Sequence, residues 1–167
     1  PNNLAPGKGI ESHIRRLYWL QKVVPEIMTN LNANYFLSPL LEAPLFTNVK
    51  SIVLAYDLIP LRYPSASFLT LYHLIYIPLI LQQSKAILCI SNSTANDLHY
   101  FYKVPRHKLF PIKLGFNNKK YYPIRKIRKK FFLIIGRHNP HKNLERVIKA
   151  FSLAKINDYQ LVFVGSF

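Results

Sequence analysis

Short apolar runs alternate along the chain with longer stretches of helical character. The apolar runs predict buried strands at residues 35–37, 51–56, 85–90, 109–114, 131–135 and 160–164. The stretches between them predict helices at residues 10–23, 25–31, 66–83, 91–102 and 143–154. Strands that are apolar throughout and separated by helices are typical of a parallel sheet that helices cover on both faces.

Two of these helices carry more detailed expectations. In residues 10–23 the helical spacing places five apolar residues on one face, opposite Arg15 and Arg16, namely Ile10, Ile14, Leu17, Tyr18 and Leu20. Pro25 stands where a proline can open a second, short helix. The apolar run at residues 68–81 has 14 residues, fewer than the ~20 needed to cross a bilayer, so we expect a buried helix there.

A basic segment divides the chain. In residues 117–130 seven of the 14 residues are Lys or Arg, and the apolar periodicity stops. We interpret this segment as a linker between domains. Residues 1–116 then form an α/β, Rossmann-like domain, and residues 131–167 form the first β-α-β unit of a second Rossmann-like domain. Because the sequence begins without Met and stops directly after the last predicted strand, we expect the first domain to be N-terminally incomplete and the second to be truncated.

Composition narrows the classes of partner. The chain has 23 Lys and Arg residues against seven Asp and Glu residues, a formal charge of +16. Such an excess attracts nucleic acid, anionic lipid headgroups or phosphorylated small molecules, although it also fits a basic surface without a specific ligand. The single cysteine, Cys89, excludes an internal disulfide framework, and its apolar run predicts a buried, inert thiol. A cytoplasmic location fits these features.

The loop GRHNPHKN, which follows the strand at residues 131–135, combines several anion-binding features. Gly136 allows close approach of the backbone to a ligand, Arg137 offers a planar fork for phosphate, and Lys142 adds a mobile charge. Asn143 can cap the following helix, whose N-terminus also favours an anion. Loops at this end of a parallel strand commonly bind ligands. The alternative is that these are ordinary solvated loop charges, since the glycine spacing of the known phosphate loops is absent.

The histidines predict no metal site. His138 and His141 flank the loop and stand three residues apart, without cysteines or carboxylates at ligand spacing. Their place beside the loop makes a contact with a donor molecule an alternative for either histidine. The other histidines singled out are expected to be core or surface residues, namely His73, His99 and His107.

The run FFLIIGRHNPHKNLERVIKAF resembles the start of the donor domain in family 4 glycosyltransferases of the GT-B fold. In that family the strand ends in Gly-Arg, a loop with proline follows, and a Lys opens the helix. The resemblance implies that Arg137 and Lys142 contact the donor diphosphate and help the leaving group depart. It extends the donor-binding set to Gly136, His138 and Asn143.

Three earlier segments resemble the same family in the same order: AYDLIPLRYP, ILCISNSTANDLHYFYKVP and KLFPIKLGFN. Carried over by position, they imply acceptor or cleft roles for five residues, namely Tyr56, Asp57, Ser91, Ser93 and Thr94. Turn formation by Asp57 and helix capping by the serines and the threonine are the structural alternatives. The sequence departs from the family at Tyr56, where a histidine is usual, and at Leu114, where Asn is common. The family's Glu-containing motif is absent.

The resemblance implies a parent enzyme that transfers a sugar from a nucleotide-diphosphate donor to an acceptor hydroxyl with retention of configuration. It implies no cofactor and no metal. The expected acceptor is a saccharide or a lipid-linked molecule. A third interpretation is peripheral attachment at the inner face of an anionic membrane through basic loops, serving a lipid-linked acceptor. We expect this piece alone to be inactive. The alternatives are a basic nucleic-acid-binding module, which lacks a recognition motif here, and an inactive remnant.

Overall fold

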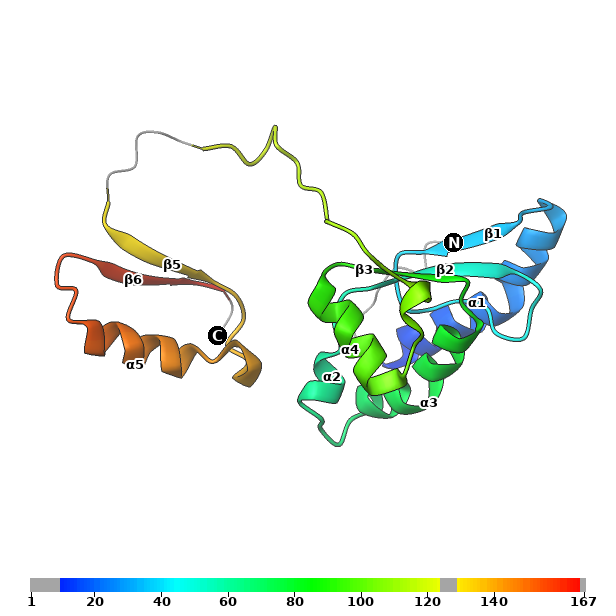
Figure 1. The fold of residues 1–167 in the computed structure, drawn as a ribbon, viewed down its shortest axis with the longest axis horizontal. Coiled ribbons are helices and arrows are strands. Elements are labelled where there is room, and N and C mark those ends of the chain that lie inside the picture. The colour runs from blue at the N-terminus through cyan, green and yellow to red at the C-terminus, as the bar shows by residue number, and fades with distance from the viewer. Residues whose placement is uncertain (1–9, 124–128, 166–167) are drawn as a thin grey trace. The chain divides into compact units, whose positions relative to one another are not determined.

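The computed structural model of the protein describes residues 10–123 and 129–165. The chain divides into two compact units, with the boundary between Gly115 and Phe116. Figure 1 shows the first unit from blue to green and the second from yellow to red. The middle of the predicted basic linker, residues 124–128, lies outside the described residues.

The first unit contains a parallel sheet with the strand order β1-β2-β3-β4. Its strands are β1 (Tyr35–Ser38), β2 (Lys50–Ala55), β3 (Ala86–Cys89) and β4 (Leu109–Pro111). The predicted α/β class with a parallel, Rossmann-like sheet is therefore confirmed. The strand predicted at residues 109–114 is shorter than expected. Its partner β3 ends at Cys89, whose carbonyl accepts the last bond, 2.7 Å from the amide of Ile112.

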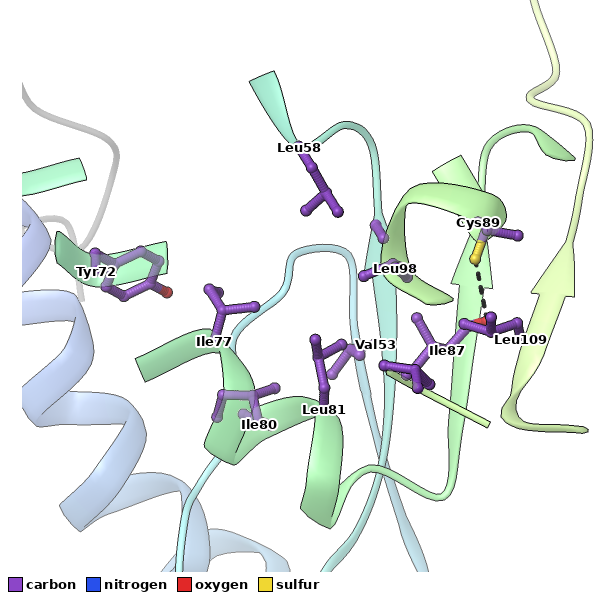
Figure 2. Packing of buried hydrophobic residues seen from close by; sticks show 14 residues of the cluster. Val53, Leu58, Tyr72, Ile77, Ile80, Leu81, Ile87, Cys89, Leu98 and Leu109 are labelled. Atoms are coloured by element: carbon purple, nitrogen blue, oxygen red, sulfur yellow. Dashed lines mark hydrogen bonds between the residues drawn. The ribbon is translucent and has the colours of Figure 1, made fainter. Parts of the chain in front are cut away.

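Helices lie on one side of this sheet (Figure 1). They are α1 (Ile10–Asn30), α3 (Phe68–Gln83) and α4 (Asn92–Tyr102), with the short helices α2 (Ile59–Arg62) and η1 (Arg106–Lys108) in the connections. The core forms where strand side chains such as Val53 and Ile87 meet Ile77 and Ile80 of α3 and Leu98 of α4 (Figure 2). Burial of these apolar side chains is the main source of stability for the unit.

The opposite face of the sheet differs from the prediction that helices cover both faces. Side chains alternate along a strand, so Tyr35, Leu37 and Phe110 point away from the helices. Leu37 is 65% exposed, and the other two are also exposed. Among the described residues, helices therefore cover one face only.

The first helix corrects two local predictions. α1 runs through Pro25 as one helix of 21 residues, where two helices were expected. Proline removes a single hydrogen bond, whereas the helix buries Leu20, Val24 and Met28 on the first unit. The predicted apolar face is correct only in part: Leu17 packs against the core and Leu20 is buried, whereas Ile14 and Tyr18 are exposed.

The helix α3 was expected to be buried, and it is buried on one side only. Ser67 caps its start by accepting a hydrogen bond from the amide of Thr70. Tyr72, Ile77 and Ile80 are buried, whereas several large apolar side chains on the outer side are exposed. A helix long and apolar enough to cross a membrane is not found in the described ranges.

The second unit is a β-α-β arrangement, as predicted. β5 (Phe131–Ile135) and β6 (Gln160–Val164) pair in parallel, and α5 (Leu144–Ala154) connects them after a short helix, η2 (Pro140–Lys142). Phe151 of α5 packs edge-on against Phe132 of β5, with 6.0 Å between the ring centroids. This packing holds the helix against the strand pair and fixes where its N-terminus lies.

Candidate functional site

The loop between β5 and α5 begins at the carboxyl end of the parallel strand pair. The amide of Gly136 donates to the carbonyl of Val164 at 2.9 Å, so the ladder extends one residue past β5. The chain then turns through Arg137 and Asn139, which share a backbone hydrogen bond of 2.9 Å. In open parallel sheets, ligands bind beyond this end of the strands.

Both predicted phosphate ligands of this loop are exposed side chains. Within the described ranges, Arg137 and Lys142 have no side-chain hydrogen bond or ion pair. Their charges are thus available to a ligand, and a charge-assisted bond from each would not first require a protein contact to break. His138 is also exposed and lines the neighbouring hollow.

The hollow beside the N-terminus of α5 has a volume of about 280 Å³. Its lining consists of His138, Asn139, Pro140, Asn143, Leu144 and Glu145. The positive end of the helix dipole faces this region, but the carboxylate of Glu145 stands in the first turn of the helix. The hollow therefore combines groups that attract an anion with one acceptor that favours hydroxyl donors.

The prediction that the Asn143 side chain caps α5 is wrong. Asn143 occupies the cap position, but its side chain makes no capping hydrogen bond. Its backbone is left-handed, with φ 54° and ψ 41°, a conformation that asparagine tolerates better than most residues. The left-handed backbone of Asn143 thus turns the chain from η2 into α5.

A second hollow, of about 290 Å³, lies in the first unit at the carboxyl end of β2. Two residues singled out from the sequence, Tyr56 and Asp57, line it. It also takes lining residues from α1, from α3 and from the segment after β1: His13, Arg16, Glu42, Tyr72 and His73. None of these five was predicted as a site residue.

Arg16 and Glu42 form the charged centre of this hollow. Arg16 donates two hydrogen bonds to the Glu42 carboxylate, from Nε at 2.8 Å and from Nη2 at 2.7 Å. The hydroxyl of Tyr72 donates to the same carboxylate at 3.3 Å. The hydrogen bond to Glu42 raises the pKa of Arg16, and burial raises that of Tyr72. One sequence signal pointed here, because Glu42 stands alone in the apolar stretch PLLEAPLF.

Two histidines border this pair. His13 Nδ1 lies 2.8 Å from Arg16 Nη2, and its ring meets the Tyr72 ring edge-on at 4.9 Å. Burial lowers the pKa of His13. Burial also lowers the pKa of His73, and the negative charge of Asp57 opposes that effect. Both rings are therefore neutral at pH 7. Nδ1 of His13 accepts from Arg16, so its Nε2 carries the proton, and Nδ1 of His73 lies 3.3 Å from the hydroxyl of Tyr102.

The remaining predicted cleft residues have structural roles. Asp57 Oδ1 accepts a hydrogen bond from the amide of Ile59 at 3.1 Å, which is a turn contact. Ser91, one of the two predicted caps, is the cap of α4 and accepts from the amide of Thr94 at 3.1 Å. Thr94 Oγ1 in turn donates to the carbonyl of Tyr56 at 3.0 Å. This contact ties the loop after β2 to the start of α4, while Ser93 is exposed.

In the described ranges, no group of three or more His, Cys, Asp or Glu side chains is placed to hold a metal ion.

No family model matches the sequence, and no curated protein matches it either. The resemblance to family 4 glycosyltransferases thus rests on the motifs quoted above.

Proposed function

We propose that the chain is part of a glycosyltransferase that uses a nucleoside-diphosphate sugar, and that the β5–α5 loop binds the donor diphosphate. The observation that carries this proposal is the exposure of Arg137 and Lys142 in one loop before the N-terminus of α5. Two positive side chains and a helix N-terminus together suit a diphosphate better than a single phosphate.

Negative charge grows on a nucleoside diphosphate as the bond to its sugar breaks. Arg137 and Lys142 would stabilise that charge more strongly in the transition state than in the ground state, which is the condition for catalysis. Because both side chains are exposed, each can rotate to follow the phosphate oxygens. Retention of configuration is an expectation from the resemblance alone.

Glu145 favours a nucleotide sugar over a bare phosphate. Its carboxylate lines the hollow next to the loop and would repel an anion placed against it. The same carboxylate accepts hydrogen bonds from sugar or ribose hydroxyls. A ligand that carries hydroxyls beside its phosphates therefore fits this loop better than pyrophosphate.

On the acceptor side, the hollow beside Tyr56 and Asp57 supports a neutral polar ligand. The Arg16–Glu42 pair is internally neutralised, the rings of His13 and His73 are neutral, and the carboxylate of Asp57 can accept hydrogen bonds from hydroxyl groups. Such a lining suits the hydroxyl groups of a saccharide. We assign the acceptor hydroxyl to this hollow.

Binding of the donor tests the proposal directly. Isothermal titration of the chain with a panel of nucleoside diphosphates and their sugar conjugates should find one base that binds. Arg137→Gln and Lys142→Gln should each weaken that binding by about tenfold to a hundredfold, the worth of a charge-assisted hydrogen bond. Lys149→Gln, which removes an exposed cation from the middle of α5, should leave it unchanged.

Glu145→Gln separates a nucleotide sugar from an adventitious anion. It should strengthen the binding of pyrophosphate, because a repulsive charge is removed, and weaken or leave unchanged the binding of the sugar conjugate. If Arg137→Gln and Lys149→Gln lost the same amount of binding affinity, a specific binding site in the β5–α5 loop would be refuted. DNA binding that falls steeply with salt, without any nucleotide effect, would favour the nucleic-acid alternative instead.

A further inference from the structure

The outer face of α3 is an exposed apolar surface, formed by Phe68, Leu71, Leu74, Ile75 and Leu79. These residues recur at spacings of three and four and so share one side of the helix. Leu74 is 59% exposed and Ile75 is 61% exposed. The whole helix, residues 68–83, contains no Asp, Glu, Lys or Arg.

Among the described residues, packing within the first unit leaves most of this face uncovered, although the Phe68 ring meets the His13 ring edge-on at 5.7 Å. The opposite side of α3 packs into the core through Tyr72, Ile77, Ile80 and Leu81 (Figure 2). A surface helix normally turns polar side chains toward water, and contiguous exposed apolar patches mark interaction sites. The exposed apolar side chains of α3 therefore indicate that this face contacts an apolar environment outside the unit.

Basic side chains border this face along one flank. Lys103 and Lys108 line a hollow together with Pro78 and Gln82 of α3. Lys108 Nζ donates to the carbonyl of Gln82 at 2.9 Å, which places its charge at the C-terminal end of the helix. The ammonium group of Lys103 lies 5.4 Å from the ring centroid of Tyr100, an exposed aromatic side chain.

Acidic residues are almost absent from this part of the chain. Between Asp57 and Glu145 the sequence holds a single carboxylate, Asp97. It is occupied by the guanidinium group of Arg62, whose Nε lies 2.8 Å from Oδ2. The flank of α3 beside Lys103 and Lys108 thus combines apolar, aromatic and basic side chains, and no carboxylate lines its hollow; Glu42 and Asp57 lie instead beside Leu69 and His73 of the same helix. This combination is complementary to lipid chains below anionic headgroups.

We propose that the outer face of α3 lies in the interface of an anionic lipid bilayer, with Lys103 and Lys108 at the level of the headgroup phosphates. The 16 residues of α3 extend over about 24 Å. They are too short to span a bilayer and long enough to lie along its surface. The inference does not rest on the proposed sugar transfer, since it uses none of the residues assigned to it.

Flotation of the full chain with lipid vesicles tests the proposal. The chain should float with vesicles that mix phosphatidylcholine and phosphatidylglycerol, and only weakly with vesicles of phosphatidylcholine alone. The double variant Leu74→Gln, Ile75→Gln should bind about tenfold more weakly, because two exposed apolar side chains are lost from the contact. Glutamine keeps the helix, which circular dichroism checks.

A matched control removes two equally exposed apolar side chains elsewhere. Leu31 and Leu153 are each 71% exposed and lie outside α3, so Leu31→Gln, Leu153→Gln should bind vesicles as the unchanged chain does. Lys103→Gln should weaken binding to the anionic vesicles, and Lys149→Gln should have a smaller effect.

A fluorescent probe shows which residue enters the lipid. Trp19 is the single tryptophan, so Trp19→Phe with Leu74→Trp places the only indole on the outer face of α3. Its emission should shift to the blue when anionic vesicles are added. Absence of vesicle binding, binding that survives in the Leu74→Gln, Ile75→Gln variant, or no blue shift would each overturn the proposal. A dimer in light scattering that the same variant abolishes would instead assign this face to a second copy.

Discussion

The carbonyl oxygen of Gly136 lies where a side chain on Gly165 would have to begin. A Cβ atom built on Gly165 would stand 1.8 Å from that oxygen and 2.8 Å from the Gly136 carbonyl carbon. The amide of Gly136 is held at the same time by the carbonyl of Val164, at 2.9 Å. The chain after β6 thus packs directly against the backbone from which the Arg137 side chain departs.

Gly165→Ala should disturb the start of the β5–α5 loop. The atoms in the way belong to the backbone, so they cannot rotate aside as a side chain would, and overpacking of this kind costs about 1 to 3 kcal/mol. We expect the Gly136 amide to lose protection against hydrogen exchange and the amide resonances of Gly136 and Arg137 to shift. Two-dimensional NMR of the labelled chain measures both.

Gly115→Ala is the matched control for this substitution. A Cβ atom at Gly115 would meet nothing within 4 Å, so the alanine should leave the spectrum of the second unit unchanged. Unchanged exchange at Gly136 in the Gly165→Ala variant would show that the two backbones are not in contact in solution.

Most of the fold could be predicted from the sequence because a buried parallel strand has an unbroken run of apolar residues. The run expected at residues 51–56 became β2, Lys50–Ala55, and the capping of α4 by Ser91 followed from residue type. Errors arose where distant contacts outweighed a local signal. Pro25 predicts a break, but the apolar side chains before and after it pack on the same surface and keep the helix continuous.

The two parts of the candidate site were unequally visible in the sequence. The loop at residues 136–143 is one continuous segment, so its cations and glycine could be noticed together. The Arg16–Glu42–Tyr72 cluster could not, because its partners are 26 and 30 residues apart in the chain. Only the fold brings these three residues together. From the sequence alone, an isolated arginine in a predicted helix is expected to be a solvated charge.

Cys89 should be unreactive in the folded protein. Its side chain is fully buried, and burial raises the pKa of the thiol to about 11. The reactive thiolate is therefore scarce at pH 8 and out of reach of reagents. We expect no reaction with a chromogenic disulfide reagent under native conditions and release of one equivalent in denaturant. Rapid labelling without denaturant would contradict the packing of β3.

The ion pair between Arg16 and Glu42 should contribute to stability only as a complete pair. The Glu42 side chain is 8% exposed, so Arg16→Met leaves a buried carboxylate without its partner. We expect the free energy of unfolding to fall by about 3 kcal/mol, the usual cost of breaking such a pair. Urea unfolding followed by the fluorescence of Trp19, in the same helix, measures the first unit.

Arg15 provides the control, since it is the next residue along α1 and pairs with an exposed carboxylate, Glu11. Arg15→Met should lower the free energy of unfolding by less than about 0.5 kcal/mol. The double variant Arg16→Met, Glu42→Leu should recover most of the stability that Arg16→Met loses, because no buried charge remains. Similar losses for Arg15→Met and Arg16→Met would argue against a special role for the Glu42 pair.

Buried His73 and half-buried His13 make the first unit sensitive to acid. Burial lowers the pKa of His13 and of His73 in the folded protein below the ~6.5 of an unfolded chain. As the pH falls through about 6.5, the unfolded state therefore takes up protons that the folded state does not. The free energy of unfolding is highest above that pH and decreases as the pH falls toward the pKa values of the folded protein.

His73→Asn should reduce this sensitivity. Asparagine can reproduce the contact of His73 Nδ1 with the hydroxyl of Tyr102, which is 3.3 Å in length, but it cannot take up a proton. The stability of the variant should change less steeply between pH 7 and pH 5, by at most about 1.4 kcal/mol per pH unit, the effect of one proton. His107→Asn, at an exposed position, should keep the original slope. An unchanged slope in His73→Asn, measured by urea unfolding at several pH values, would mean that the His73 ring is protonated in the folded protein as readily as in the unfolded chain.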